Sequence, residues 1–286
     1  MAVTVTLKDA SNNDVTGAAA ALTTNAVKVA NATLKSSNWT DNNDGTYRAT
    51  YLAQTSGTGL KATLTLDGWG QSATSPAYAI TVGTAVPVNS AITTDKTTYT
   101  AGDEMTVTVT LKDASNNGVT GAAASLTTDA VKVANATLKS SNWTDNNDGT
   151  YSATYLAQTS GTGLKATLTL DGWGQSATSP AYTITVGAAA QVNSAIMTDK
   201  TTYTAGDEMT VTVTLKDASN NDVTGAAAAL TTNAVKVANA TLKSSNWTDN
   251  NDGTYRATYL AQTSGTGLKA TLTLDGWGQS ATSPAY

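Results

Sequence analysis

The sequence predicts an all-β protein made of tandem domains. Three observations carry this prediction: a long internal repeat, strands with two-residue alternation, and turn-forming residues between the strands. The string KDASNN begins at Lys8, Lys112 and Lys216, so the period is 104 residues. That period is too long for a solenoid unit of roughly 20 to 50 residues, and it matches a complete small domain of roughly 100 residues.

Two-residue alternation predicts half-buried antiparallel strands in each repeat. In the stretch MTVTVTLKDA, Val107, Val109 and Leu111 fall on one face and threonines fall on the other. Three further runs of the middle repeat alternate in the same way. Their inward sets are Leu164, Ala166, Leu168 and Leu170; Tyr151, Ala153 and Tyr155; and Tyr182, Ile184 and Val186.

The alanine-rich stretch GAAAALTTNAVKVANATL leaves two alternatives open. Its threonines, together with Val27, Val29 and Asn31, favour short strands joined by a loop, whereas Ala18 to Ala21 would tolerate a helical turn.

Turn-rich strings separate the predicted strands: SNNG, TDNNDG, TSGTG and DGWGQS. About seven short strands in roughly 100 residues, with turns between them, are typical of an immunoglobulin-like β-sandwich. The predicted fold class is therefore all-β, a tandem array of immunoglobulin-like β-sandwich domains that forms an elongated rod.

Composition excludes most catalytic chemistry. The chain has no cysteine and no histidine in 286 residues, which removes disulfides, thiolate nucleophiles, Ser-His-Asp triads and imidazole metal sites. Asp103 and Glu104 are adjacent carboxylates, but neighbours in a strand point to opposite faces and cannot act as a paired acid and base. We therefore predict no enzymatic activity and no cofactor, and we assign no catalytic, cofactor-binding or metal-binding residue.

The charge argues against two classes of partner. The formal net charge is −5 and the pI is near 4.6, whereas nucleic acids and anionic membranes require clustered lysine and arginine. No apolar run approaches the roughly 20 residues of a membrane span. We expect no nucleic-acid partner and no membrane contact by this segment.

The stretch WTDNNDGTY occurs unchanged at Trp39, Trp143 and Trp247. A calcium loop of the EF type is excluded, because Gly45 falls where the third ligand should be and no glutamate follows at the required distance. A β-hairpin turn with Asp44 and Gly45 at its tip fits better, and a weak surface cation site is the alternative. We expect Trp39 to cover the end of the core and Tyr47 to face inward.

A second tryptophan lies between two glycines in LDGWGQS, at Trp69, Trp173 and Trp277. Such a residue on a tight loop could present an exposed aromatic face to a sugar or a protein partner, and three copies would bind multivalently. The alternative is that it packs on the adjoining domain or covers its own core.

These residues resemble a known family. The stretch VNSAITTDKTTYTAGDEMTVTVTLKDASNNGVTGAAASL, followed by WTDNNDGTYSATYLAQTSGTGLKATLTL, is similar to the bacterial immunoglobulin-like domain of group 1, found in intimins and invasins. The matching elements include Ala101-Gly102-Asp103 and the Asp148, Gly149 and Tyr151 signature. The resemblance covers essentially the whole chain. It implies rigid spacer domains of a surface adhesin, which an outer-membrane barrel anchors and a receptor-binding domain often terminates.

The repeat predicts three domains with boundaries at 1–87, 88–191 and 192–286. Met1 aligns with Met105 and Tyr286 aligns with Tyr182, so we expect domain 1 to lack its first strand and domain 3 to lack its last strand. Each would expose an unpaired sheet edge. We predict that the complete middle domain is the most stable, and that the outer two are frayed or recruit strands from other molecules.

The junctions VGTAVPVNSAI and VGAAAQVNSAI contain no long Gly/Ser tract, which indicates closely spaced domains with restricted bending. Pro87, which Gln191 replaces at the second junction, should stiffen the first link further.

The leading functional hypothesis is a stalk or spacer segment of a bacterial cell-surface adhesin that projects a distal binding domain. We expect it to be extracellular and anchored to the outer membrane through a region absent here. Its expected partners are the neighbouring repeats, and a host receptor or glycan through domains not present. The alternative is a multivalent carbohydrate- or protein-binding module that uses the Gly-flanked tryptophan loops.

Overall fold

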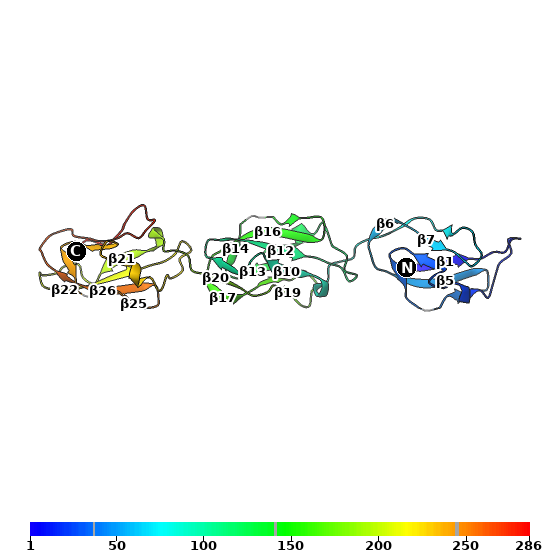
Figure 1. Ribbon diagram of the computed structural model, residues 1–286, viewed down its shortest axis with the longest axis horizontal. Helices are drawn as coiled ribbons and strands as arrows, with labels where there is room; N and C mark the ends of the chain where they lie inside the picture. Colours follow the sequence, from blue (N-terminus) through cyan, green and yellow to red (C-terminus); the bar gives the residue numbers. More distant parts are fainter. Residues whose placement is uncertain (37, 140–141, 244–245) are drawn as a thin grey trace.

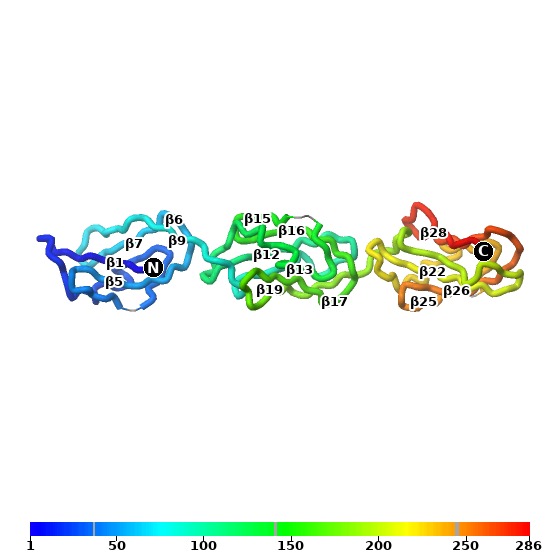
Figure 2. Tube along the Cα trace, turned by 180° about the vertical axis from the view of Figure 1, so that it is seen from behind, coloured from blue at the N-terminus to red at the C-terminus, as the bar shows by residue number. Residues whose placement is uncertain are grey.

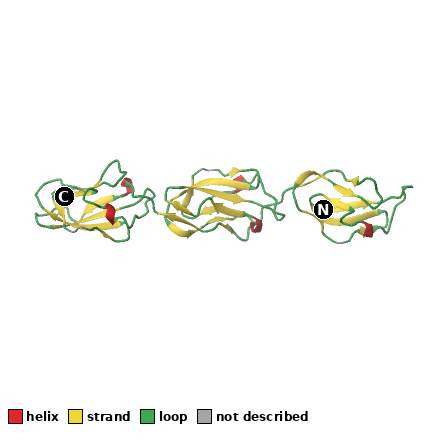
Figure 3. Cartoon of the chain, viewed as in Figure 1, coloured by secondary structure: helices red, strands yellow, loops and turns green. Residues whose placement is uncertain are grey.

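Three β-sandwich units lie end to end in the computed structural model, which describes residues 1–286 except 37, 140–141 and 244–245 (Figure 1). Seen from behind, the chain passes once from each unit to the next (Figure 2). Strands and loops make up nearly all of each unit, with a few single-turn helices (Figure 3). In the described residues, the buried apolar side chains form three separate clusters, so each unit has its own core.

The second unit has the fullest set of strands, and its first layer follows the order β10-β12-β16-β14, with β15 also paired to β16. All these pairings are antiparallel. The strands are β10 (Ala91–Thr94), β12 (Glu104–Thr110), β14 (Ala136–Leu138), β15 (Thr144–Asp145) and β16 (Thr150–Ala157).

The opposite layer contains two three-stranded sheets, β11-β20-β17 and β13-β18-β19. β20 pairs in parallel with β11 and antiparallel with β17. Only Lys165 separates β17 from β18, so the two sheets continue one another. The strands are β11 (Thr98–Thr100), β13 (Val131–Val133), β17 (Gly161–Leu164), β18 (Ala166–Leu168), β19 (Ala177–Thr178) and β20 (Tyr182–Thr185).

The first and third units repeat this plan with fewer strands. The first contains β1 (Ala2–Thr6), β2 (Val27–Val29), β3 (Ala32–Leu34), β4 (Thr40–Asp41), β5 (Thr46–Ala53), β6 (Gly57–Leu60), β7 (Ala62–Leu64), β8 (Ala73–Thr74) and β9 (Tyr78–Ile80). The third contains β21 (Ala195–Thr198), β22 (Glu208–Thr214), β23 (Val235–Val237), β24 (Ala240–Leu242), β25 (Thr248–Asp249), β26 (Thr254–Ala261), β27 (Ala270–Leu272) and β28 (Ala281–Thr282).

The two-residue alternation predicts the core of the middle unit well. Val107, Val109 and Leu111 are fully buried, and so are Tyr151 and Leu168. The all-β tandem sandwich prediction is confirmed. Leu164 and Leu170 are only partly buried. The prediction that Val186 faces the core is wrong, because Val186 follows β20 and is 36% exposed.

The alanine-rich stretch contains both structures that the sequence left open, short strands and a helical turn. Val27–Val29 and Ala32–Leu34 are strands, and Ala19–Ala21 form a single turn of 3-10 helix (η1). The same turn recurs as η3 (Ala123–Ser125) and η5 (Ala227–Ala229).

A buried tyrosine fixes that segment in every unit. The Tyr151 hydroxyl donates to the Val119 carbonyl at 2.6 Å and accepts from the Ala122 N–H at 3.1 Å. The side chain has no exposed surface. Tyr47 and Tyr255 make the same pair of bonds in their own units. Because a buried polar group requires a partner, this hydroxyl specifies where the loop crosses the core.

Candidate functional site: the joints between units

A preformed loop lies at the entry end of each unit. In the middle unit, Asp113 Oδ1 accepts the backbone N–H groups of Ser115 and Asn117, both at 2.9 Å. Asn116 between them has a φ of 68°, which asparagine tolerates better than most residues. The Asp-Ala-Ser-Asn-Asn sequence therefore folds locally into a turn that its own aspartate stabilises. We call residues Asp113–Asn117, and their equivalents 9–13 and 217–221, the Asp-Asn loop.

The Asp-Asn loop of the middle unit binds the first unit. Asn117 Nδ2 donates to the Gln54 carbonyl at 2.7 Å, and Asn117 Oδ1 accepts the Ser56 N–H at 2.9 Å. Asp113 Oδ2 accepts the N–H of Gly83 at 2.9 Å. One amide side chain thus satisfies a carbonyl and an N–H of the neighbouring unit, while the carboxylate holds the connecting segment.

The second joint repeats the first. Asn221 Nδ2 donates to the Gln158 carbonyl at 2.7 Å, and the Ser160 N–H donates to Asn221 Oδ1 at 2.9 Å. Gly187 N–H donates to Asp217 Oδ2 at 2.9 Å. Because both joints use the same bonds at the same lengths, the units follow one another with one repeated geometry.

The linkers are bonded to the units that they enter. Val86 N–H donates to the Lys112 carbonyl at 2.8 Å, and Ala85 forms a β-bridge with Asp113. Each linker then makes one 3-10 turn, η2 (Pro87–Asn89) or η4 (Gln191–Asn193). Since Gln191 supports the same turn as Pro87, proline does not determine the linker conformation.

The Gly-flanked tryptophans bind the same linkers. Trp173 Nε1 donates to the Ala85 carbonyl at 3.2 Å, and Trp277 Nε1 donates to the Ala189 carbonyl at 3.0 Å. Both side chains are half-buried, whereas Trp69, in the first unit, is 42% exposed. Trp173 and Trp277 also pack against the core of their own unit, which was one of the two alternatives to an exposed binding face.

Burial and hydrogen bonding act in opposite directions on the joint carboxylate. Asp113 is 5% exposed and Asp217 is 1% exposed. Burial is the largest single influence and raises the pKa of Asp113, but the hydrogen bonds from Gly83, Asn117 and Ser115 together hold the pKa below its ordinary value. Burial also raises the pKa of Asp217, and hydrogen bonds from Asn221, Gly187 and Ser219 together hold it below its ordinary value. The joints are therefore built around ionised carboxylates.

The WTDNNDGTY stretch is a hairpin turn. Strands β4 and β5 pair on either side of it. Asp41 Oδ1 accepts the Asn43 N–H at 2.8 Å, and Asp44 Oδ1 accepts the Thr46 N–H at 3.0 Å. Asn43 and Gly45 both have positive φ, as a tight turn requires. Trp39 is 6% exposed and packs edge-on against Tyr51, which confirms its expected place in the core.

A shallow groove recurs beside each Gly-flanked tryptophan loop. It has a volume of about 820 Å³ in the first unit, about 520 Å³ in the second and about 580 Å³ in the third. In the second unit Ala85 of the linker forms one wall, with Trp173 and Asp171 near it. Hydroxyl, carboxylate and aromatic groups, which sugar recognition uses, line the groove of the second unit. Among the described residues, no aromatic side chain lines the groove of the first or the third unit.

The adjacent carboxylates Asp103 and Glu104 each have a partner of their own. Asp103 Oδ2 accepts the N–H of Thr100 at 2.9 Å, and Glu104 pairs with Lys139 at the surface. Over the residues that the structure describes, no group of three or more acidic side chains could hold a metal ion. In the same part of the chain, no helix has the length and apolar character needed to cross a membrane.

A family model described as invasin, domain 3, matches residues 86–189 and again 190–285. The chain belongs to this family. These two matches divide the chain with a period close to the sequence repeat. The invasin domain 3 assignment confirms the resemblance to intimin- and invasin-type domains.

Individual relatives of these invasin-type domains are adhesins. The inverse autotransporter adhesin YeeJ of Escherichia coli strain K12 is 31% identical over 198 residues, which are 67% of this chain and 8% of YeeJ. Among solved structures, the E. coli adhesin FdeC aligns with 26% identity and a TM-score of 0.43 over 100% of this chain and 91% of FdeC. Invasin, a bacterial integrin-binding protein, aligns with 19% identity and a TM-score of 0.45 over 100% of this chain and 56% of invasin.

The sequence patterns did not predict which residues form the joints. KDASNN marked the period, and SNNG marked a turn, but neither pattern indicated that Asp113 and Asn117 would bond to another unit. One feature of the sequence could have indicated the joint. The second asparagine of the string, Asn13, Asn117 or Asn221, donates to the aspartate of its own loop, and its amide oxygen is not needed for that bond.

Proposed function

We propose that this chain is a stalk segment of a bacterial surface adhesin, which holds a distal binding domain away from the cell. The proposed domains are 1–87, 88–191 and 192–286. The segment would be extracellular, anchored to the outer membrane through a region outside this chain. Host receptors or glycans would be bound by domains outside it as well, and the partners of these residues would be the neighbouring repeats.

The observation that carries this proposal is that the two joints are made by the same hydrogen bonds. A spacer must transmit position along its length, which requires that each unit is fixed to the next. Asn117 and Asn221 each bond to two backbone groups of the preceding unit, and the carboxylates beside them are buried. Bonds of this kind resist bending, because any tilt of one unit breaks several polar contacts at once.

Insertion of a further copy of residues 88–191 tests the proposal. A stalk made of fixed joints should gain the same increment of length with each inserted copy, measured as the maximum dimension in small-angle X-ray scattering. In a full-length adhesin carrying this segment, the distal domain should also move outward from the cell. An increment that shrinks with each copy would contradict the proposal.

The exposed side chain of the Gly-flanked Trp69 favours a second candidate, a multivalent carbohydrate- or protein-binding module that uses the tryptophan loops. Glycan titration of the 286-residue chain, followed by tryptophan fluorescence, tests it directly. A binding module should give a saturable change that Trp69→Ala weakens, because Trp69 is the most exposed of the three. A pure spacer should give no saturable change with any glycan.

A further inference from the structure

The dipeptide Asn-Gly occurs once in the chain, at Asn117 and Gly118. Asn117 is also the residue whose side chain joins the first two units. At the equivalent position of the second joint, Asn221 is followed by Asp222. The two joints therefore make the same hydrogen bonds but differ in the residue that follows the bonding asparagine.

The residue after an asparagine decides how easily that asparagine loses ammonia. The backbone nitrogen of the next residue attacks the side-chain carbonyl carbon, the bond to the side-chain nitrogen breaks, and the displaced proton leaves with the ammonia. Water then opens the cyclic succinimide at either carbonyl, which gives aspartate or isoaspartate. Glycine favours ring closure because it has no Cβ to crowd the ring. Aspartate opposes it with a side chain and with a negative charge beside the attacking nitrogen.

The backbone nitrogen of Gly118 is not engaged by the protein. Val119 N–H donates to the Leu111 carbonyl at 2.9 Å, and on the other side Asp113 N–H donates to the Asn117 carbonyl at 3.0 Å. These two bonds flank Gly118, and no described residue accepts the Gly118 N–H. No hydrogen bond therefore holds back the nitrogen that has to attack.

The amide of Asn117 is held at both of its polar atoms while the joint is closed. Its Nδ2 donates to the Gln54 carbonyl at 2.7 Å and to Asp113 Oδ2 at 2.9 Å. Its Oδ1 accepts the Ser56 N–H at 2.9 Å. Because ring closure must turn this amide onto the Gly118 nitrogen, these bonds have to break first. The closed joint thus protects Asn117, and the reaction requires local opening.

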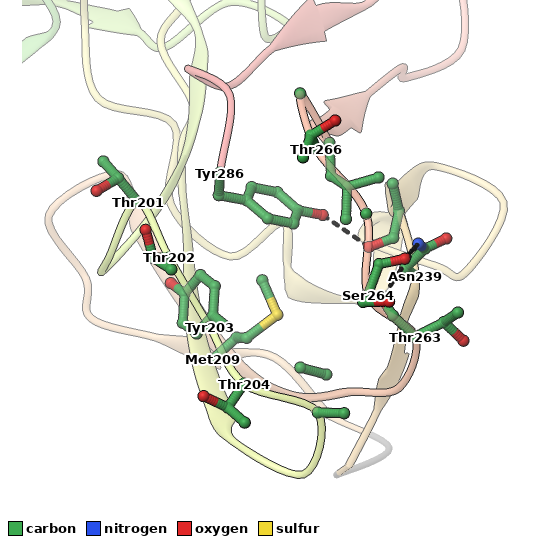
Figure 4. A pocket seen from close by; sticks show the side chains of 16 residues that line it. Thr201, Thr202, Tyr203, Thr204, Met209, Asn239, Thr263, Ser264, Thr266 and Tyr286 are labelled. Atoms are coloured by element: carbon green, nitrogen blue, oxygen red, sulfur yellow. Dashed lines mark hydrogen bonds between the residues drawn. The ribbon is translucent and has the colours of Figure 1, made fainter.

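Other asparagines are held by similar bonds but are followed by residues that carry side chains. In the third unit, Asn239 Nδ2 donates to the Thr263 carbonyl at 3.2 Å and to the Ser264 carbonyl at 3.3 Å (Figure 4). Its successor is Ala240. Asn117 therefore differs from the other asparagines in its neighbour and not in how its side chain is bonded.

Deamidation would replace the Nδ2 donor of Asn117 by a carboxylate oxygen. That oxygen would face the Gln54 carbonyl and the Asp113 carboxylate, at the positions that now lie 2.7 and 2.9 Å from Nδ2. Neither group has a proton to share, and two carboxylates at this distance repel each other. Isoaspartate would also lengthen the backbone by one methylene. Neither product can re-form the bonds of the joint.

We propose that Asn117-Gly118 is a deamidation site, and that its reaction opens the first joint irreversibly. The second joint persists because Asp222 follows Asn221. Each opening of the first joint exposes Asn117 to the reaction, so the fraction of deamidated chains records how often this joint has opened. The proposal rests on the geometry of the joint and not on the stalk function.

The test incubates the 286-residue chain in heavy-oxygen water at neutral pH and physiological temperature, followed by tryptic digestion and mass spectrometry. Trypsin releases Asn117 in peptide 113–132, which differs in sequence from the mutually identical peptides 9–28 and 217–236. Heavy oxygen should enter peptide 113–132 at Asn117, as a mixture of aspartate and isoaspartate, well before it enters the other two. Conversion should be slower than in a synthetic 113–132 peptide, because the closed joint protects the side chain.

A matched variant and a distance measurement complete the test. Gly118→Asp reproduces the KDASNND sequence of the third unit, which folds with Asp222 at this position, and it should abolish the early conversion. Spin labels at Lys61→Cys and Lys132→Cys report a distance across the first joint. During a parallel incubation, the broadened fraction of this distance should rise with the deamidated fraction, and in Gly118→Asp it should not rise.

Three results would overturn the proposal. The first is equal entry of heavy oxygen into all three tryptic peptides, and the second is early conversion that persists in Gly118→Asp. The third is a deamidated chain whose label distance stays as narrow as before the incubation, because the product would then still form the joint.

Discussion

Asn117 Nδ2 lies 2.7 Å from the Gln54 carbonyl oxygen, and this contact joins two units that are otherwise folded around separate cores. The equivalent asparagine of the first unit, Asn13, is exposed. It nevertheless bonds to Asp9 as Asn117 bonds to Asp113, at 2.9 Å in both cases. The loop is therefore organised before any neighbour docks, so docking costs little additional conformational entropy.

Replacement of Asn117 by alanine should loosen the first joint. The change removes both interdomain bonds, each worth about 0.5 to 1.5 kcal/mol to the docked state, and water can replace Asn117 at the exposed Gln54 carbonyl. The chain has no native cysteine, so spin labels at Lys61→Cys and Lys132→Cys would report one distance across this joint. We expect that distance distribution to broaden. Asn13→Ala removes the same local bonds without a neighbouring unit, and it should leave the distribution unchanged.

Acid should loosen both joints together. The pKa values of Asp113 and Asp217 are lowered in the folded chain, so their contribution to docking is complete above the ordinary aspartate pKa of about 3.9. It is lost as the pH falls below that value through the lowered pKa. The same label pair should therefore show a constant distribution from neutral pH down to about pH 4 and broadening below it. In Asp113→Asn, broadening of the first joint should no longer depend on pH.

Replacement of Trp173 by phenylalanine should weaken the hold on the first linker. The indole donor to the Ala85 carbonyl is lost while most of the apolar contact remains, so the expected cost is about 1 kcal/mol. Amide exchange in the segment from Gly83 to Asn89 should become faster. Trp69→Phe is the matched control, because it alters an exposed indole in the unit that lacks this contact. Unchanged exchange in the Trp173 variant would assign the residue to core packing alone.

Removal of the hydroxyl from Tyr47, Tyr151 and Tyr255 should destabilise every unit. Each hydroxyl bonds a half-buried carbonyl and an N–H of the loop before the 3-10 turn, so the loss should be about 1 to 3 kcal/mol per unit. Chemical denaturation of the triple Tyr→Phe variant measures it. A loss below about 0.5 kcal/mol would mean that the loop is held by other contacts.

Local patterning in the sequence was sufficient to predict the sandwich. Val107, Val109 and Leu111 alternate with threonines, and this alternation alone specifies which face is buried. The hairpin was predicted with Asp44 and Gly45 at its tip, and in the structure the positive φ values fall at Asn43 and Gly45.

Contacts between units could not be predicted in the same way. Asn13 and Asn117 both end a KDASNN string, yet in the structure Asn13 is exposed and Asn117 bonds to Gln54 and Ser56. Val186 was misplaced for a related reason, since alternation gives a face but does not indicate where a strand ends. The repeat pattern predicts the structure of each unit but does not predict the contacts between neighbouring units.

Small-angle X-ray scattering of the 286-residue chain tests the central claim, that fixed joints hold the three units in a line. A single compact body of this length would have a radius of gyration of about 19 Å. We predict a value well above that, with a pair-distance distribution that shows maxima at the regular spacing of rigid units. A radius of gyration near the compact value, or a smooth distribution typical of units moving independently, would contradict the account.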